Sequence, residues 1–451
     1  MARRVLMVSP HFPPDSSAGA HRVRLLAPHL RTFGWDTTVV TVDPRDYEGP
    51  LDPQLAELVP PWVRVIRCRA WPVRWTRLCG IGDLGLRAFR TLYNTCYRLL
   101  ATEHFDALFV TLLPGYPALL GRLLKARFTL PFVLDYQDPW VGAWGQTVGG
   151  SRNGEPDLKS RFTRKLALWL EPHALRAADA ITAVSEGTLE GILERHLRAK
   201  NIPRVTIPIG GEQADFDSLR TKAPQNQYFD PHDGNVHFCY VGTLLPLGFE
   251  TLRGLIQAVV MIRNRHPELY RRLRLHFFGT SNQRNSRAPQ RVLPVAKALG
   301  AEDCVTEVAN RIDYLDALTV LTQATAIVMM GSSERHYTAS KLYPGLLARR
   351  PIFAMYHEAS SVVDVLRAAG RPPSVRLVTF DDIHRAESRA EAAYIELSAI
   401  LRDPHYDATA VNMDAVQEFS AEHLAGKMAR VLNEVVQRDT DCGMRSVCGK
   451  Q

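Results

Sequence analysis

The sequence predicts an α/β protein made of two doubly wound domains that face each other across a cleft. Three observations lead to this fold class. Short apolar segments alternate with segments of helical period along almost the whole chain. The apolar segments are nearly continuous, as expected for parallel strands that helices cover on both faces. The alternation stops once, near residue 210, and a length of 451 residues suits two large domains.

The first domain is predicted over residues 1–209, and it begins with a strand that leads into a helix. In that helix Val23, Leu26, Leu30 and Phe33 recur at the spacing of one helical face. Helical segments separate most of the later strands. The seven strands are predicted at 4–9, 37–42, 63–68, 106–111, 132–136, 179–185 and 205–209.

A polar segment, 210–235, interrupts this rhythm. It contains Gly, Pro, Asp and Asn, and we interpret it as a linker. The alternation resumes in a second domain over 236–411, and the polar residues 438–451 are predicted to form a disordered tail. The six strands of the second domain are predicted at 237–242, 274–279, 304–309, 325–331, 351–356 and 375–380.

Composition narrows the class of protein. Hydrophobic residues make up 46% and charged residues 23%, as in ordinary globular domains. The seven cysteines are scattered without a CxxC pair, which indicates a reducing cytoplasm and no metal knuckle. The apolar run after the two N-terminal arginines is too short for a signal peptide, and no window of about 20 residues is apolar enough to span a membrane. A net charge of +8 favours anionic partners.

Several cofactor and catalytic motifs are missing. No G-x-G-x-x-G follows the first strand, so a nicotinamide-type cofactor is not expected. The sequence also contains no G-K-[ST] of a P-loop and no H-E-x-x-H of a zinc protease. The basic residues do not interleave with a nucleic-acid-reading motif, so we expect no nucleic-acid partner.

Two loops of the first domain contain candidate residues where strands end. Gly19 opens the helix after the first strand, where glycine lets a ligand approach the backbone and free N–H groups attract phosphate; a plain turn explains it equally well. Asp138 follows the strand at 132–136, where an acid can act as a base or orient a hydroxyl. Its place before Pro139 is also typical of a residue that initiates a turn.

In the second domain a Gly-Thr pair follows each of the first two strands. Gly242 and Thr243 follow its first strand, and Gly279 and Thr280 follow its second. Two such turns favour a backbone cradle for phosphate, although tight turns also select glycine.

Lys341 stands where the sequence predicts the start of a helix, behind the strand at 325–331. Ser340 or Thr338 can cap that helix, and Pro344 is tolerated only near a helix start. A cation is disfavoured at the positive end of a helix dipole unless an anion lies between them. We therefore predict that Lys341 binds a diphosphate; a lysine that points into solvent is the alternative.

Taken together, these segments resemble the GT-B glycosyltransferases of the large group-1, or family-4-like, kind, over about residues 4–437. The resemblance rests on the order and spacing of "VLMVSPHFPPDSSAGAHRVRLLAPHL", "LDYQDPW", "ADAITAVSEG", "IPIGG", "YVGTL", "LHFFG" and "ASKLYPGLLARRPIFA". It implies two Rossmann-like domains, with a nucleotide-sugar donor held by the second and a last helix, about 412–437, that packs back on the first. It also implies no cofactor, no bound catalytic metal and retention of anomeric configuration.

The resemblance also implies roles for individual residues. Gly19 would lie beside the donor phosphates, Asp138 would lie on the acceptor side, and Arg311 and Ile312 match a loop that frames the base. The residues implied to line the diphosphate site are Gly242, Thr243, Ser340 and Lys341.

The sequence also departs from the family. The family's paired glutamates fall at His336 and Pro344, and Glu334 is the nearest acid. The resemblance therefore assigns no residue here to the donor ribose contacts or to the transition-state charge.

Residues 67–100 contain seven arginines, two tryptophans and one aspartate. Basic residues beside Trp, Leu and Phe suit a helix on an anionic membrane surface, which would place the protein at the inner face of the membrane. An amphipathic helix packed on its own domain gives the same pattern, and both readings stay open.

The predicted function is transfer of a sugar from a nucleotide-diphosphate sugar to a glycan, lipid-linked or small-molecule hydroxyl, as in polysaccharide biosynthesis. Lys341 and backbone N–H groups would assist departure of the diphosphate. The alternatives are a nucleotide-sugar epimerase or hydrolase of the same fold, and a non-catalytic partner subunit.

Overall fold

The computed structural model describes residues 2–49, 51–141, 158–222, 224–281, 288–333 and 341–448, with side chains through residue 440. The chain divides into two compact units. Unit 1 is Met1–Ile209 together with Ala421–Gln451, and unit 2 is Gly210–Ser420.

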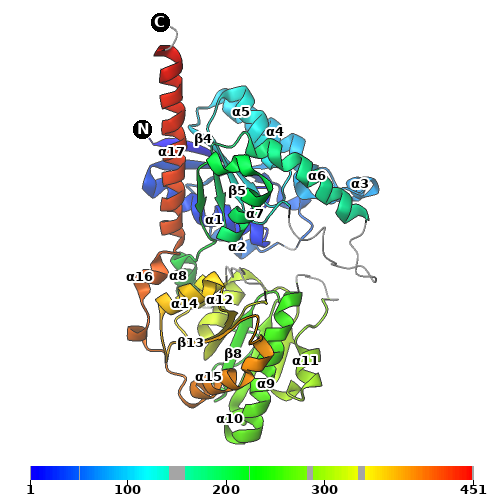
Figure 1. Cartoon of the computed structure of the whole chain (residues 1–451), viewed down its shortest axis with the longest axis vertical. Coiled ribbons are helices and arrows are strands. Elements are labelled where there is room, and N and C mark those ends of the chain that lie inside the picture. Colours follow the sequence, from blue (N-terminus) through cyan, green and yellow to red (C-terminus); the bar gives the residue numbers. More distant parts are fainter. Residues whose placement is uncertain are drawn as a thin grey trace. The chain divides into compact units, whose positions relative to one another are not determined.

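Unit 1, drawn in blue to green with α17 in red in Figure 1, is built on a seven-stranded sheet in which every neighbouring pair is parallel, in the order β3-β2-β1-β4-β5-β6-β7. This is a doubly wound order, and the direction of winding reverses between β1 and β4. The strands are β1 Arg3–Val8, β2 Trp35–Val42, β3 Arg64–Cys68, β4 Ala107–Leu112, β5 Phe132–Tyr136, β6 Ala180–Ala183 and β7 Arg204–Thr206.

The helices of unit 1 follow the strands in alternation. Their bounds are α1 Ala18–Leu30, α2 Pro53–Glu57, α3 Val73–Thr76, α4 Leu84–Thr102, α5 Ala118–Phe128, α6 Leu158–Leu175, α7 Glu186–Arg195 and α17 Ala421–Cys448.

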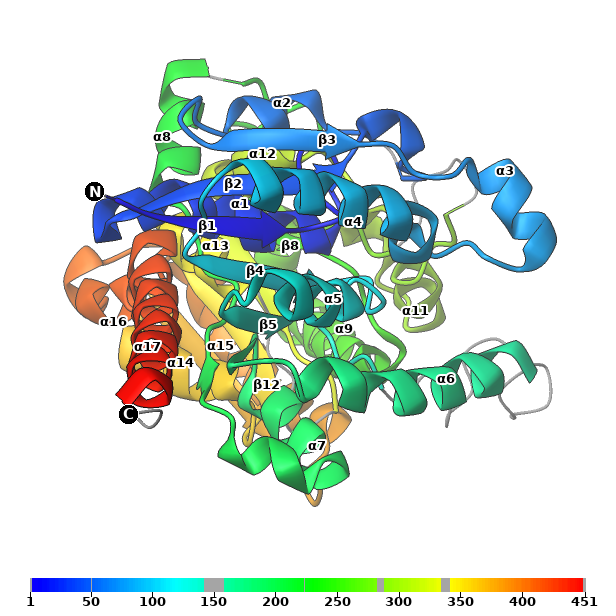
Figure 2. The ribbon, with the colours of Figure 1, turned by 90° about the horizontal axis from the view of Figure 1, so that it is seen from above.

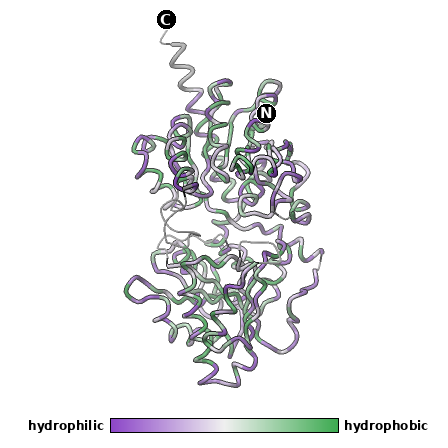
Figure 3. Tube along the Cα trace, turned by 90° about the vertical axis from the view of Figure 1, so that its right-hand side faces the viewer, coloured by the Kyte–Doolittle hydropathy of each residue, from purple (hydrophilic) through white to green (hydrophobic). Residues whose placement is uncertain are grey.

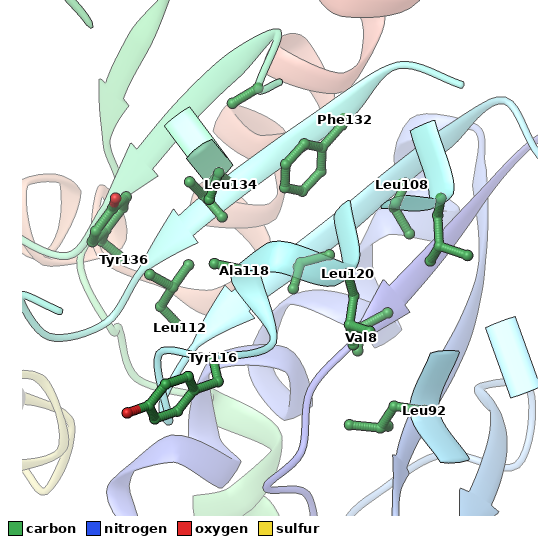
Figure 4. Packing of buried hydrophobic residues seen from close by; sticks show 14 of the residues in the cluster. Val8, Leu92, Leu108, Leu112, Tyr116, Ala118, Leu120, Phe132, Leu134 and Tyr136 are labelled. Carbon is green, nitrogen blue, oxygen red and sulfur yellow. The ribbon is translucent and has the colours of Figure 1, made fainter. Parts of the chain in front are cut away.

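Close packing between α5 and β5 shows how one face of this sheet is covered. Gly121 of α5 leaves room for Phe132, whose ring would lie 2.0 Å from a β-carbon at that glycine. Phe132, Leu134 and Tyr136 point to the same side of β5, where they join one apolar cluster with residues of α4 and α5 (Figure 4). Helices on both faces explain why these strands are mostly apolar.

The last helix, α17, completes the other face of unit 1. Leu424, Met428 and Leu432 are buried in the cluster that contains α1, and Trp35 donates a hydrogen bond from Nε1 to Oδ1 of Asn433 over 3.1 Å. The helix expected at 412–437 begins at Ala421 instead, and the tail expected to be disordered from residue 438 is helical through Cys448.

Unit 2 has a six-stranded sheet of the same kind, with the order β10-β9-β8-β11-β12-β13 and only parallel pairs. The strands are β8 Val236–Val241, β9 Leu273–Phe278, β10 Val305–Val308, β11 Ala326–Met330, β12 Ile352–His357 and β13 Val375–Phe380. The helices are α8 Gln213–Lys222, α9 Phe249–Arg265, α10 Pro267–Arg272, α11 Leu293–Ala298, α12 Tyr314–Gln323, α13 Leu342–Leu347, α14 Ser361–Ala369, α15 Ala390–Arg402 and α16 Met413–Gln417.

The segment expected to be a linker, 210–235, contains helix α8 and belongs to unit 2. Phe216 and Leu219 of α8 are buried, and Tyr314 donates a hydrogen bond from its hydroxyl to Asp215 over 2.7 Å. The sequence hides this helix because only two of its ten residues are large and apolar.

Both predicted sheets are thus confirmed, and each predicted strand has an observed counterpart whose ends lie within three residues. Colouring by hydropathy shows hydrophobic segments inside each unit and hydrophilic ones at its surface (Figure 3). Among the described helices, none is both long and apolar enough to cross a membrane.

Candidate active site

In unit 2 the direction of winding reverses between β8 and β11. Ligands of doubly wound sheets bind beyond the carboxyl ends of the strands at such a reversal. Gly242 comes directly after β8, and Lys341 comes after β11, directly before α13. The two residues are ninety-nine positions apart in the sequence, yet the fold brings them into contact.

The Lys341 side chain points at the end of β8. Its Nζ donates a hydrogen bond to the carbonyl oxygen of Thr243 over 3.3 Å and lies 5.4 Å from the centre of the Tyr240 ring. Lys341 as a residue is partly buried. Burial, with a smaller contribution from the positive charge of Arg311, lowers the pKa of Lys341 to about 7.

Gly242 makes this placement of Lys341 possible. A β-carbon at position 242 would lie 1.9 Å from the lysine Nζ, and the φ angle of +140° is one that L side chains rarely adopt. Glycine is therefore needed for both space and backbone conformation. The sequence indicated a close approach at this glycine, and the approaching group is the lysine side chain.

The amides of the two predicted turn glycines are engaged in the sheet. The N–H of Gly242 donates to the carbonyl of Phe278 over 2.7 Å, and the N–H of Gly279 donates to that of Val308 over 2.8 Å. These two N–H groups are therefore not available to phosphate. Gly279 has a φ of +69°, and a β-carbon there would lie 3.7 Å from Cα of Arg311. The turn at Gly279 therefore lies close to the backbone of the loop after β10.

The other candidates of unit 2 differ in what they contact. Arg311 lies close enough to Lys341 for their charges to interact. Ile312 packs against the apolar cluster that contains Phe278. The buried Thr280 donates a hydrogen bond from its hydroxyl to the Glu307 carboxylate, so this side chain supports the loop.

The expected start of α13 agrees with the structure to within two residues, because the helix begins at Leu342. Three candidates lie outside the described residues: Glu334, Thr338 and Ser340.

One basic residue near this site escaped the sequence analysis. Arg291 donates a hydrogen bond from its guanidinium to the carbonyl of Leu244, in the loop that follows β8. Glu307 fixes the segment around Arg291, because it accepts the backbone N–H groups of Arg291, Val292 and Leu293 over 2.8–3.0 Å. No motif marks this arginine, and only the fold brings it to β8.

In unit 1 the corresponding reversal lies between β1 and β4. A β-carbon at Gly19 would lie 2.9 Å from the side chain of Leu113, in the loop after β4. This glycine therefore lets α1 pack against that loop. Nearby, His11 bonds through Nδ1 to the carboxylate of the buried Asp15. Burial opposes ionisation of Asp15, but hydrogen bonds from His11 and Ser17 leave its pKa lowered. The sequence analysis did not identify this pair.

Asp135 and Asp138 stand three residues apart in very different surroundings. Asp135 is fully buried, pairs with Arg22 through two hydrogen bonds of 2.6 and 3.1 Å, and also accepts the hydroxyls of Thr111 and Thr182. Asp138 has an exposed side chain that bonds to none of the residues described in the structure. Partial loss of hydration raises the pKa of Asp138. Only Asp138 has a carboxylate available to a ligand.

Comparison with known proteins supports the same fold. Residues 17–210 match the family model described as Glycosyl transferase 4-like domain. No curated protein sequence matches the chain at a significant level.

Among solved structures, the chain is similar to HepE from Anabaena in complex with UDP and glucose, with a TM-score of 0.60 and 13% identity over 96% of this chain and 100% of that one. It is similar to a UDP-forming α,α-trehalose-phosphate synthase from Burkholderia xenovorans, with a TM-score of 0.60 and 12% identity over 96% and 99% of the two chains. A UDP-GlcNAc 2-epimerase from Methanocaldococcus jannaschii matches with a TM-score of 0.50 and 11% identity over 96% and 100%.

The two parallel doubly wound sheets and these neighbours define a protein of the GT-B fold. Its residues 17–210 are similar to the Glycosyl transferase 4-like domain. The fold and this domain match agree with the resemblance that the sequence motifs indicated.

Proposed function

We propose that this protein is a glycosyltransferase that moves a sugar from a nucleoside-diphosphate sugar to a hydroxyl group of a glycan, a lipid-linked acceptor or a small molecule. One observation carries the proposal: the Lys341 ammonium lies at the end of β8, where burial lowers its pKa to about 7. An anion that binds beside this ammonium favours its charged form. A diphosphate has the charge and the size for this role.

The chemistry places the largest charge change on the leaving group. The bond between the anomeric carbon and the β-phosphate oxygen breaks, and the diphosphate leaves with the bonding electrons. Lys341 and Arg311 stabilise this developing charge, and charge-assisted hydrogen bonds to phosphate are stronger than neutral ones. Burial of the Lys341 ammonium increases the effect, because a less polar environment screens the attraction less.

The acceptor hydroxyl must lose its proton in the same reaction. Asp138 is our candidate to orient this hydroxyl, because its carboxylate bonds to no described residue and its pKa is raised. We further propose retention of configuration and turnover without a metal ion. Product stereochemistry by NMR tests the first, and activity that survives EDTA supports the second.

A donor panel tests the proposal directly. UDP-sugars come first, because the HepE and trehalose-phosphate synthase structures are described with UDP or as UDP-forming. Lys341→Met should weaken donor binding or turnover by roughly 10²–10³-fold, as does loss of one preorganised donor in other enzymes. Lys297→Met is the matched control, since Lys297 is exposed on α11 of the same unit. Normal kinetics in Lys341→Met would contradict the proposal.

The same assays separate the alternatives. Release of sugar, or its epimerisation, without an acceptor would indicate a hydrolase or epimerase. A protein that binds no donor and activates a second glycosyltransferase would be a partner subunit.

A further inference from the structure

Exposed aromatic and apolar side chains gather on two helical segments of unit 1. The first is residues 71–79, which contain α3 and the short helical turn Arg77–Cys79, and the second is α6. Five large side chains on these segments expose between 56% and 80% of their surface: Trp71, Trp75, Leu78, Phe162 and Trp169. Soluble surfaces rarely expose so many tryptophans and phenylalanines together.

The structure narrows the membrane segment expected from the sequence. Helix α4, the larger part of 67–100, buries Leu84, Ala88, Leu92 and Cys96 in the core, so its apolar face is already occupied. The most exposed apolar groups of 67–100 lie in its first part, around residues 71–78. The sequence analysis did not identify α6 as a second part of the same surface.

Both segments lie at one side of unit 1. α3 follows the carboxyl end of β3, and α6 begins after the loop that leaves the carboxyl end of β5. The view from above shows α3 and the first half of α6 projecting from the same side of the sheet, one on each flank (Figure 2), and Figure 1 agrees. The two segments can therefore meet one extended partner surface.

Helix α6 presents apolar and basic side chains on the same face. Phe162, Lys165 and Trp169 are spaced i, i+3 and i+7, and all are exposed. Ala167 and Glu171, on the opposite face, are fully buried. This face is apolar and basic together, as in helices that lie in a membrane interface.

The positive charge of this surface is available to a partner. Arg74, whose guanidinium lies 5.5 Å from the centre of the Trp75 ring, forms no ion pair within the part of the chain that the structure describes. The same holds for Lys159, Arg161 and Lys165 of α6. By contrast, Arg77 pairs with Glu48. The partner of this surface must therefore be anionic as well as apolar.

We propose that Trp71, Trp75, Leu78, Phe162 and Trp169, with Arg74, Lys159, Arg161 and Lys165, dock unit 1 on an anionic lipid bilayer. Tryptophan is favoured at the boundary between headgroups and acyl chains, and each basic residue near an anionic leaflet strengthens binding about fivefold. The docked surface lies at the strand ends that carry Asp138, so it brings lipid-linked acceptors to that carboxylate. Only this last step rests on the proposed function.

Vesicle binding of the full chain tests docking without any sugar transfer. The protein should cosediment with vesicles of phosphatidylcholine and phosphatidylglycerol in equal parts, much less with pure phosphatidylcholine, and less as salt rises. Replacing Lys159, Arg161 and Lys165 together by Gln should weaken binding roughly 100-fold, from three steps of about fivefold. Trp75→Ser with Trp169→Ser should weaken binding to anionic vesicles by at least about tenfold.

Trp62→Ser is the matched control. Trp62 is 54% exposed, but it precedes β3, at the opposite end of that strand from Trp71. Its replacement should leave vesicle binding unchanged. A fluorophore on the exposed Cys79, in a protein with Cys442 and Cys448 replaced by Ser, should shift to shorter wavelength on anionic vesicles.

Donor binding by the same variants separates this inference from the proposed function. Intact donor binding with no vesicle binding by the wild-type chain would overturn the docking proposal and leave the function standing. A wild-type dimer that Trp75→Ser with Trp169→Ser separates, again without vesicle binding, would overturn it in favour of self-association. Equal binding to neutral and anionic vesicles would also overturn it.

Discussion

The lowered pKa of Lys341 predicts that donor binding takes up a proton. With a pKa of about 7 in the free protein, roughly a quarter of the Lys341 side chains are protonated at pH 7.5. A bound diphosphate favours the charged ammonium and returns the pKa toward its ordinary value of 10.5. Binding at pH 7.5 should therefore take up about three-quarters of a proton per site, and binding at pH 6 only about a tenth.

The same linkage fixes how affinity depends on pH. Because the free site loses its proton as the pH rises through 7, while the occupied site keeps it, donor binding weakens with increasing pH. Between pH 6 and pH 8.5 the dissociation constant should rise about 30-fold, with a slope that approaches tenfold per pH unit above pH 8. The ligand should be a nucleotide sugar, because its diphosphate lacks the terminal phosphate ionisation of a free nucleotide.

Titration calorimetry in buffers of different protonation enthalpy measures this proton uptake directly. Lys341→Arg is the informative comparison, since a guanidinium stays protonated throughout this range and its binding should show little proton exchange. Donor affinity that is constant from pH 6 to 8.5, with no dependence of the heat on the buffer, would refute the reasoning. It would mean that Lys341 is already charged in the free protein or does not contact the diphosphate.

Three further predictions concern the surroundings of the two candidate sites. Gly242→Ala should weaken donor binding about as strongly as Lys341→Met, because its β-carbon would occupy the place of the lysine ammonium, whereas Gly234→Ala, at a φ of +83° with open space around it, should leave binding unchanged in the same assay. Arg22→Leu leaves the buried Asp135 carboxylate without its cation, and it should lower the free energy of unfolding by about 3–5 kcal/mol in urea denaturation; a loss below 1 kcal/mol would show that the pair is dispensable. Burial, aided by nearby positive charge, lowers the pKa of His276 to about 4, so its contribution to stability is present above pH 6.5 and is lost as the pH falls toward 4. Between pH 7 and pH 4.5, the free energy of unfolding in urea should fall by about 2 kcal/mol less in His276→Phe than in the wild type. Equal decreases in the two proteins would contradict this.

The central strands could be predicted from the sequence because they are mostly apolar. β4 and β5, for example, are buried along their full length, so their composition alone marks them. Helix α8 could not be predicted, because its buried face consists mainly of Phe216 and Leu219, and two apolar residues are too few to show a helical period. The end of α17 was missed for a related reason: it continues as a polar helix beyond the residues that pack on α1.

The site was harder to predict because its contacts join distant parts of the chain. The sequence indicates that another group approaches the backbone closely at Gly19 and at Gly242, but it does not identify that group. In the structure the neighbours are the side chains of Leu113 and Lys341. Arg291 had no local signal at all, since its position beside the loop after β8 depends on the pairing of β8 with β9 and on Glu307.

The segment "LDYQDPW" shows where a family motif stops being informative. Asp135 and Asp138 are both aspartates near the end of one buried strand, and the sequence gives either of them the position of a catalytic acid. Burial separates them. Asp135 lies inside the sheet, where an unpaired charge would be costly, and it is neutralised by Arg22 and two hydroxyls. Asp138 lies three residues further on, past the end of the strand, where its carboxylate has no described partner, which is why we propose Asp138 and not Asp135 as the residue that orients the acceptor hydroxyl.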